Sequence, residues 1–268
     1  TCTGRGYIMK PNIVYLHSHD TGCYLRPYGY NVPTPNIQRF AEQGVLFRQA
    51  FCAAPTCSPS RASLLTGQAP HSCGQFGLVN RGFELRDREK HLAQTLRNAG
   101  YYTAVVGVHH VVRDPMSCGY VQQLPRVGEG DAGTARAAAK FLRNPPSEPF
   151  FLSVGFIVTH RPFPKCGLGE ANYCLPPSPI PDTPRTRQDW AAFKASVRLL
   201  DSYVGTVLKA LDHSDSAENT LVILTTDHGI AFPKMKCNLT DHGIRVMLII
   251  RGPGGFSGGK VVDAMVSQ

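Results

Sequence analysis

The sequence lacks several features that would assign it to a class at once. It has no run of about 18 apolar residues, so we expect no helix that spans a membrane. It has no dense block of lysine and arginine mixed with aromatic residues, which argues against nucleic acid as a partner. Its nine cysteines include no CxxC pair, so a zinc knuckle or a small disulfide-framework fold is unsupported. One or two disulfides remain open, with Cys166 and Cys174 as a candidate pair.

The overall composition is that of an ordinary globular protein with an excess of basic over acidic residues. The 268 residues are 42% hydrophobic and 18% charged, enough for one large domain or for a domain with a small appendage. Lysine and arginine outnumber aspartate and glutamate by 28 to 19, which gives a net charge of +9. This balance favours an anionic partner or substrate.

Apolar segments with the periods of strands and helices alternate along the chain. This alternation predicts an α/β fold, with a mostly parallel central sheet and helices on both faces. The segment 162–184 has seven prolines and is expected to be a long ordered loop. The predicted strands are 12–17, 45–51, 101–107, 150–157, 221–224 and 246–250. The predicted helices follow Thr34 up to Gly44, begin at Pro59 after Ser58 as N-cap, and cover 91–99, 131–143 and 189–211.

Residues 57–67, with the letters CSPSRASLLTG, combine a nucleophile with an anion site. Ser58 as N-cap and Pro59 at the first helical position predict a helix start, and Gly67 suits the helix end. Cys57 then lies just before a helix N-terminus, where free N–H groups and the helix dipole favour an anion. Arg61 can reach the same place with a planar, permanently charged group. The alternative is a buried helix start with an inert cysteine.

Four predicted strands are followed by polar clusters: His19-Asp20, His109-His110, His160-Arg161 and Asp227-His228. Ligands of open α/β sheets bind beyond the carboxyl ends of the strands. Asp20 and Asp227 are therefore candidate ligands of a hard cation. His110 and His160 suit proton transfer or hydrogen bonding to a leaving group, and Lys236 adds a positive charge in the loop after Asp227.

The letters CxPSR followed by LLTG resemble the signature of the sulfatase family. The resemblance covers residues 11–252, where a strand-end aspartate, the signature, a Gly-x-x-His, a strand-end histidine and an Asp-His-Gly follow in family order. The segments FRQAF at 47–51 and GIAFP at 229–233 look closest to the heparan N-sulfatase (sulfamidase) branch. The family implies an alkaline-phosphatase-like fold and hydrolysis of sulfate esters or sulfamates, on a sulfated sugar such as a glycosaminoglycan.

The resemblance implies a role for Cys57 that the unmodified residue cannot fill. In sulfatases a maturation enzyme oxidises this cysteine to formylglycine, whose hydrate is the nucleophile and also a metal ligand. One hydroxyl attacks sulfur and expels the alcohol or amine, and the second drives the C–O cleavage that releases sulfate. Arg61 would stabilise the hydrate.

The resemblance also implies roles for the strand-end residues. Asp20, Asp227 and His228 would bind calcium, with magnesium as the less favoured ion. His110 would bind sulfate and His160 would protonate the leaving group. Lys236 lies near a basic residue that the family carries after its second metal motif.

Two positions depart from the family pattern. The usual Asp-Asp after the first strand is here His19-Asp20, and a histidine nitrogen is a poor calcium ligand, so His19 is an open candidate ligand. The usual Gly-Lys-x-His is here Gly-Val-His-His, so Val108 replaces a lysine that normally bridges nucleophile and sulfate. We hypothesise that His109 substitutes for that lysine.

The resemblance also predicts the context of the chain. Family members usually continue into a smaller C-terminal subdomain, so we expect 1–268 to be the N-terminal part of a sulfatase catalytic domain. A periplasmic, secreted or lysosomal location is implied, although the first six residues contain no apolar signal core. Two alternatives stay open: a phosphomonoester or phosphonate ester hydrolase of the same superfamily, and a catalytically silent binder of sulfated glycans.

Overall fold

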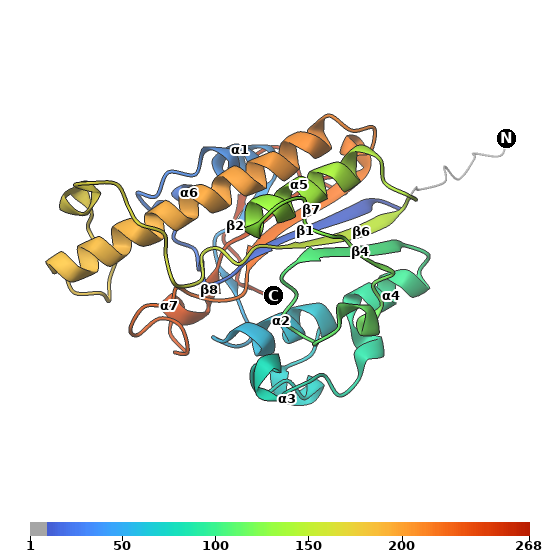
Figure 1. The fold of residues 1–268 in the computed structure, drawn as a ribbon, viewed down its shortest axis with the longest axis horizontal. Helices are drawn as coiled ribbons and strands as arrows, with labels where there is room; N and C mark the ends of the chain where they lie inside the picture. The colour runs from blue at the N-terminus through green and yellow to red at the C-terminus, as the bar shows by residue number, and fades with distance from the viewer. Residues whose placement is uncertain (1–9) are drawn as a thin grey trace.

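A computed structural model describes residues 10–268 as a central sheet with helices on both faces (Figure 1). The main sheet has eight strands in the order β10-β2-β9-β7-β1-β6-β4-β5. Among these described strands β9 alone runs opposite to its neighbours, so the sheet is mostly parallel, as predicted. The strands are β1 (Asn12–Ser18), β2 (Val45–Phe47), β4 (Tyr102–Gly107), β5 (Gln122–Gln123), β6 (Phe150–Gly155), β7 (Thr220–Thr226), β9 (Leu248–Arg251) and β10 (Lys260–Val262).

The helices form a layer on each side of this sheet (Figure 1). One layer contains α1 (Pro35–Gln43), α5 (Gly130–Arg143) and α6 (Pro184–Asp212). The other contains α2 (Cys57–Thr66), α3 (Pro70–Cys73) and α4 (Leu92–Asn98). A short helix, α7 (Asp241–Ile244), follows the loop after β7. None of the helices in residues 10–268 is long and apolar enough to cross a membrane.

The strand β1 shows why the central strands have continuous apolar sequences. Successive side chains of a strand point to opposite faces. Val14 and Leu16 are buried in the cluster that contains residues of α1, α5 and α6, whereas Tyr15 is buried in the cluster with Ala62 and Leu65 of α2. Both faces therefore exclude water, and the predicted α/β class is confirmed.

Two predicted strands are wrong in their extent. The segment 45–51 divides into β2 and β3 (Ala50–Phe51), and 246–250 divides into β8 (Arg245–Val246) and β9. β2 pairs with β9 in the main sheet, whereas β3 pairs with β8 in a second sheet of order β11-β3-β8, where β11 is Val266–Ser267. Each of the two predicted strands therefore passes from one sheet to the other, and they do so at the same place, because their segments pair with each other in both sheets. Apolar periodicity cannot reveal that bend, because residues on each side of it are buried.

The proline-rich segment 162–184 is a loop, as predicted, with one 3-10 turn at Glu170–Tyr173. Cys166 and Cys174 are both free thiols, so the candidate disulfide between them is wrong. The helix predicted at 189–211 is confirmed but begins earlier, at Pro184. The Thr183 hydroxyl accepts the N–H of Thr186, and proline occupies the first helical turn.

We predict that Gly107→Ala destabilises the protein far more than Gly29→Ala. Both glycines have a left-handed φ, 83° and 88° respectively. A Cβ on Gly107 would lie 2.0 Å from the carbonyl oxygen of Gly155, whereas one on Gly29 meets nothing within 4 Å. Denaturant unfolding should show a loss of about 1 kcal/mol for Gly29→Ala, from backbone strain alone, and about 3 kcal/mol or more for Gly107→Ala. Equal losses would show that the β4–β6 contact is not tight.

Candidate active site

The four polar clusters lie at one edge of the sheet. β7, β1, β6 and β4 are successive neighbours and run parallel, so their carboxyl ends meet. The β1–β7 register pairs Ser18 with Thr226. This register places His19-Asp20 directly beside Asp227-His228. The structure thus brings together residues about 200 positions apart in the sequence, as predicted.

The two carboxylates form the centre of the site. The side chains of Asp20 and Asp227 are fully buried. The backbone N–H of Asp20 donates a hydrogen bond to Asp227 Oδ1 at 2.8 Å. Asp20 has a left-handed φ of 52°, which is strained for a residue other than glycine. The fold therefore stores strain where it places these carboxylates side by side.

The helix α2 begins two positions earlier than predicted. Cys57 is its first residue, Thr56 is the N-cap, and Ser58 lies inside the first turn rather than capping it. The Ser58 hydroxyl instead accepts the backbone N–H of Val79. Ser60 donates its hydroxyl to the backbone oxygen of Asp227 at 2.5 Å, which attaches the helix start to the end of β7.

Cys57 is buried against the carboxylate centre. Its Sγ lies 3.3 Å from His228 Nε2 and 3.6 Å from Lys236 Nζ. Burial, together with the charge of Asp227, raises the pKa of the Cys57 thiol to about 12. As an unmodified thiol Cys57 is therefore protonated at neutral pH and is a poor nucleophile.

Arg61 is completely buried and contacts the carboxylate centre rather than the thiol. Its Nη2 donates to Asp227 Oδ2 at 2.9 Å and to the carbonyl of Ser18 at 2.8 Å. Burial opposes ionisation of Asp227, but the neighbouring His228, Arg61 and His19 side chains favour the carboxylate and hold its pKa well below the usual range. Arg61 therefore keeps Asp227 charged and connects α2 to β1 and β7.

Lys236 supplies the second positive charge of the centre. Its Nζ lies 2.9 and 3.0 Å from the two carboxylate oxygens of Asp20. Burial lowers the pKa of this amine, but the charge of Asp20 and the neighbouring Cys57 outweigh that effect and raise the pKa overall. The structure thus places Lys236 between a carboxylate and the predicted nucleophile.

Two imidazoles complete a set of donors that fits a divalent cation. One ligand atom each from His19, Asp20, Cys57 and Asp227 lies within 4.8 Å of the others. His228 Nε2 lies 3.3 Å from Asp20 Oδ1 and 3.7 Å from Asp227 Oδ2. Because a ring nitrogen of His19 belongs to this group of ligand atoms, the His19 side chain points into the carboxylate centre. The set of two carboxylates, two imidazoles and Cys57 is typical of a metal site.

His110 and His160 border the same centre. The ring of His19 lies 5.6 Å from that of His110 and 5.8 Å from that of His160, measured between centroids. Burial and Arg61 lower the pKa of His110 to about 4, so this ring is neutral at neutral pH. The His160 side chain is 38% exposed, and its Nδ1 lies 2.6 Å from the Arg161 carbonyl. Because Nδ1 must donate to that carbonyl, Nε2 of His160 is the nitrogen left for a ligand.

The family profile of sulfatases matches residues 11–268. The chain belongs to the sulfatase family. It is 31% identical to human N-sulphoglucosamine sulphohydrolase over 96% of its own length and 58% of that protein. It spans between 48% and 67% of the length of three curated relatives that it matches.

Solved structures share the fold of this sulfatase-family chain. Ps i-CgsB, solved in complex with k-i-k-neocarrahexaose, is 22% identical with a TM-score of 0.78, over 96% of this chain and 69% of that one. The phosphonate monoester hydrolase of Agrobacterium radiobacter is 21% identical with a TM-score of 0.72, over 96% and 71%. At these identities the likeness shows the fold alone, and it supports the predicted α/β architecture.

The structure does not support the hypothesis that His109 replaces the lysine lost at Val108. His109 is buried, and its Nε2 lies 3.2 Å from His91 Nε2. Its ring also packs edge-on against Tyr120. His109 and His110 are adjacent in the chain, and only the ring of His110 joins the donor group of Cys57 and His19.

His17 is a part of the candidate site that no sequence motif singled out. Its Nδ1 lies 2.5 Å from Arg61 Nη1, and its Nε2 lies 3.3 Å from the Ser153 hydroxyl. Burial and Arg61 together lower the pKa of His17 well below its ordinary value, so the neutral ring can accept from Arg61. The available signal was a histidine within an apolar strand, since a buried polar side chain requires a partner.

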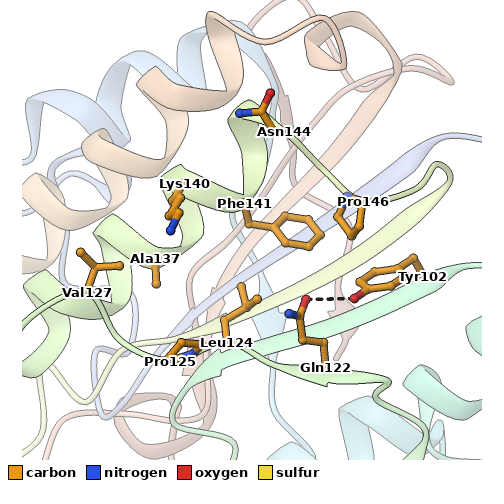
Figure 2. Close-up of a pocket in the computed structure, with 10 residues that line it drawn as sticks. All are labelled: Tyr102, Gln122, Leu124, Pro125, Val127, Ala137, Lys140, Phe141, Asn144 and Pro146. Atoms are coloured by element: carbon orange, nitrogen blue, oxygen red, sulfur yellow. Dashed lines mark hydrogen bonds between the residues drawn. The ribbon is translucent and has the colours of Figure 1, made fainter.

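A separate cavity of about 440 Å³ lies between α5 and β5 and holds none of these residues (Figure 2). Its lining is mainly apolar, with Phe141, Leu124 and Pro146 among the side chains, and Tyr102 donates its hydroxyl to Gln122 there. The lining residues of this cavity are thus distinct from those of the candidate site.

We predict that His17→Leu destabilises the protein by about 1–3 kcal/mol, because it leaves a buried Arg61 donor without an acceptor. The matched control is Ser153→Ala, which removes only the 3.3 Å contact on the other side of the ring and should cost less. Denaturant unfolding of both variants measures the difference. An equal or larger loss for Ser153→Ala would mean that His17 does not hold Arg61.

Proposed function

We propose that the protein hydrolyses sulfate esters or sulfamates of a sulfated sugar, with Cys57 converted to formylglycine beside a divalent cation. The observation that carries the proposal is the position of Cys57. It occupies the first turn of α2, with its Sγ 3.3 Å from His228 and 3.6 Å from Lys236, at the end of a pair of strands that carry two buried carboxylates. Membership of the sulfatase family supports the reaction class.

The chain provides fixed positive charge where a sulfate group would bind. Lys236 and the N-terminus of α2 both lie at Cys57. Arg61 acts indirectly, since it keeps Asp227 charged and in place. A bound cation supplies Lewis-acid stabilisation of the sulfate oxygens. These groups are preorganised, so they stabilise charge that develops during transfer without moving.

His160 is the group best placed to protonate the leaving alcohol or amine. Its exposed side chain lies at the mouth of the site, with Nδ1 fixed by the Arg161 carbonyl and Nε2 3.9 Å from Asp20. His110 is more buried and neutral, which suits hydrogen bonding to the sulfate group rather than ion pairing.

The likeness to human N-sulphoglucosamine sulphohydrolase favours an N-sulfated sugar as substrate. The net charge of +9 agrees with an anionic glycan. By the same resemblance, a formylglycine-generating enzyme is the partner during maturation, and the location is periplasmic, secreted or lysosomal. Calcium is the ion that the resemblance implies.

We predict that mass spectrometry of the peptide containing Cys57, from chain produced with a formylglycine-generating enzyme, shows loss of one sulfur and two hydrogens and gain of one oxygen. The same preparation should release sulfate from sulfated sugars, and Cys57→Ala should reduce turnover to background, because the nucleophile is missing. Cys73→Ala, which removes another buried thiol, should retain activity.

The outcome also separates the alternatives. Formylglycine with turnover of phosphate or phosphonate esters but not of sulfates would favour the phosphohydrolase. Unmodified Cys57 with tight binding of a sulfated sugar would favour a silent binder. Normal turnover by Cys57→Ala would contradict the proposed mechanism.

We predict that His160→Ala slows hydrolysis of a sugar sulfamate or sulfate by about 10²–10⁴-fold. A nitrophenyl sulfate should lose much less, because its leaving group needs no proton. Steady-state kinetics on both substrates measure the contrast, with His213→Ala, at the exposed end of α6, as the control. Equal losses on both substrates would exclude a general-acid role for His160.

A further inference from the structure

The donor set between β1 and β7 contains more nitrogen than calcium prefers. Calcium takes six to eight oxygen ligands. Here the strand-end candidates are two carboxylates, Asp20 and Asp227, and two imidazoles, His19 and His228. Imidazole suits zinc and other first-row transition ions, whereas carboxylate also suits calcium and magnesium. The two histidines therefore shift the preference of the site from calcium toward ions that bind imidazole nitrogen.

His228 is already arranged as a metal ligand. Its Nδ1 lies 2.9 Å from the carbonyl oxygen of Gly229, to which it must donate a proton. Its Nε2 lone pair then faces Cys57 Sγ and Asp20 Oδ1, both at 3.3 Å. The Cys57 thiol can donate to this lone pair, whereas the Asp20 carboxylate repels it, and a cation between His228 and Asp20 would remove that repulsion. Histidines that bind metals commonly donate their other nitrogen to a backbone carbonyl in this way.

His19 presents a second nitrogen to the same space. Its side chain is 1% exposed, and its Nδ1 lies 3.1 Å from Asp227 Oδ2 without the alignment of a hydrogen bond. Neither ring nitrogen makes a hydrogen bond within residues 10–268. A buried imidazole that lacks partners is costly. A metal ion between His19 and Asp227 would satisfy it.

The carboxylates of the site are few for calcium. Asp20 is paired with Lys236 at 2.9 Å, and Asp227 is paired with Arg61 at 2.9 Å. These fixed positive charges act equally on any divalent cation, so the choice of ion depends on the ligand atoms. Calcium affinity depends on the number of charged oxygen ligands, and Asp20 and Asp227 are the two carboxylates of this donor set. The imidazole nitrogens of His19 and His228 add affinity for zinc but little for calcium.

We propose that this site selects a first-row transition ion of the zinc class over calcium, through His19 and His228. The inference uses the same site as the proposed function and refines the identity of its cation. It concerns binding, so it can be tested without turnover.

The test is a set of competition titrations with Zn²⁺, Mn²⁺ and Ca²⁺, together with the metal content of the purified chain. The chain carries Cys57→Ala, because an unmodified thiol would attract zinc by itself. We expect one zinc ion per chain, binding that excess Ca²⁺ or Mn²⁺ does not displace, and ligand-field absorption in the visible range on loading with Co²⁺. Tighter binding of Ca²⁺, or no binding of any of these ions, would overturn the proposal.

The decisive variant is His19→Asp, which replaces the nitrogen by the oxygen that calcium prefers. It should shift the ratio of zinc to calcium affinity by at least about tenfold toward calcium. His213→Asp changes the net charge equally, at a distance from the site, and should leave the ratio unchanged. If His19→Asp does not fold, His19→Ala should weaken zinc and spare calcium. An unchanged ratio in the folded variant would overturn the role of His19.

A second group of soft donors requires its own control. His91, His109 and Cys118 have ligand atoms within 4.8 Å of one another and are all buried. The titrations are therefore repeated with Cys118→Ala, and a selectivity that depends on Cys118 would overturn the assignment to His19 and His228. Sulfate release is assayed separately: selective metal binding without turnover contradicts the proposed function alone, and turnover with calcium preference contradicts this inference alone.

Discussion

The pairing of two buried carboxylates is the constraint on which the site depends. Parallel β1 and β7 are in a register that pairs Ser18 with Thr226, so Asp20 and Asp227 emerge side by side at the sheet edge. Two such charges cannot be buried without compensation. Arg61 from α2 and Lys236 from the loop after β7 provide it. The position of α2, and with it Cys57, thus follows from the need to neutralise Asp227.

Much of this arrangement could be predicted from the sequence. Each of the central strands is apolar on both faces, which marked it as a buried parallel strand, and each is followed at once by a polar cluster. Parallel strands in one sheet have their carboxyl ends at one edge, so Asp20, His110, His160 and Asp227 were expected to meet. The signature at 57–67 identified the helix that approaches them.

The sequence could not show at which residue helix α2 begins, or which of two adjacent histidine side chains enters the site. The letters around Ser58 suit a capping residue, yet the helix starts at Cys57, because Ser58 bonds to Val79 and Ser60 to the end of β7. His109 and His110 are chemically identical, and the left-handed φ of 61° at His110 decides which of them enters the site. Tertiary contacts of this kind have no local signal. His17 is a similar case, since its role appears only once Arg61 is placed beside it.

The two departures from the sulfatase pattern compensate each other in charge. Replacing the usual aspartate by His19 removes one negative charge, since burial and Arg61 lower the pKa of His19 to about 3 and keep the ring neutral. Replacing the usual lysine by Val108 removes one positive charge. The net charge around Cys57 is therefore that of the family pattern, with an imidazole in place of a carboxylate. Lys236, 3.6 Å from Cys57 Sγ, leaves an ammonium group beside the nucleophile position.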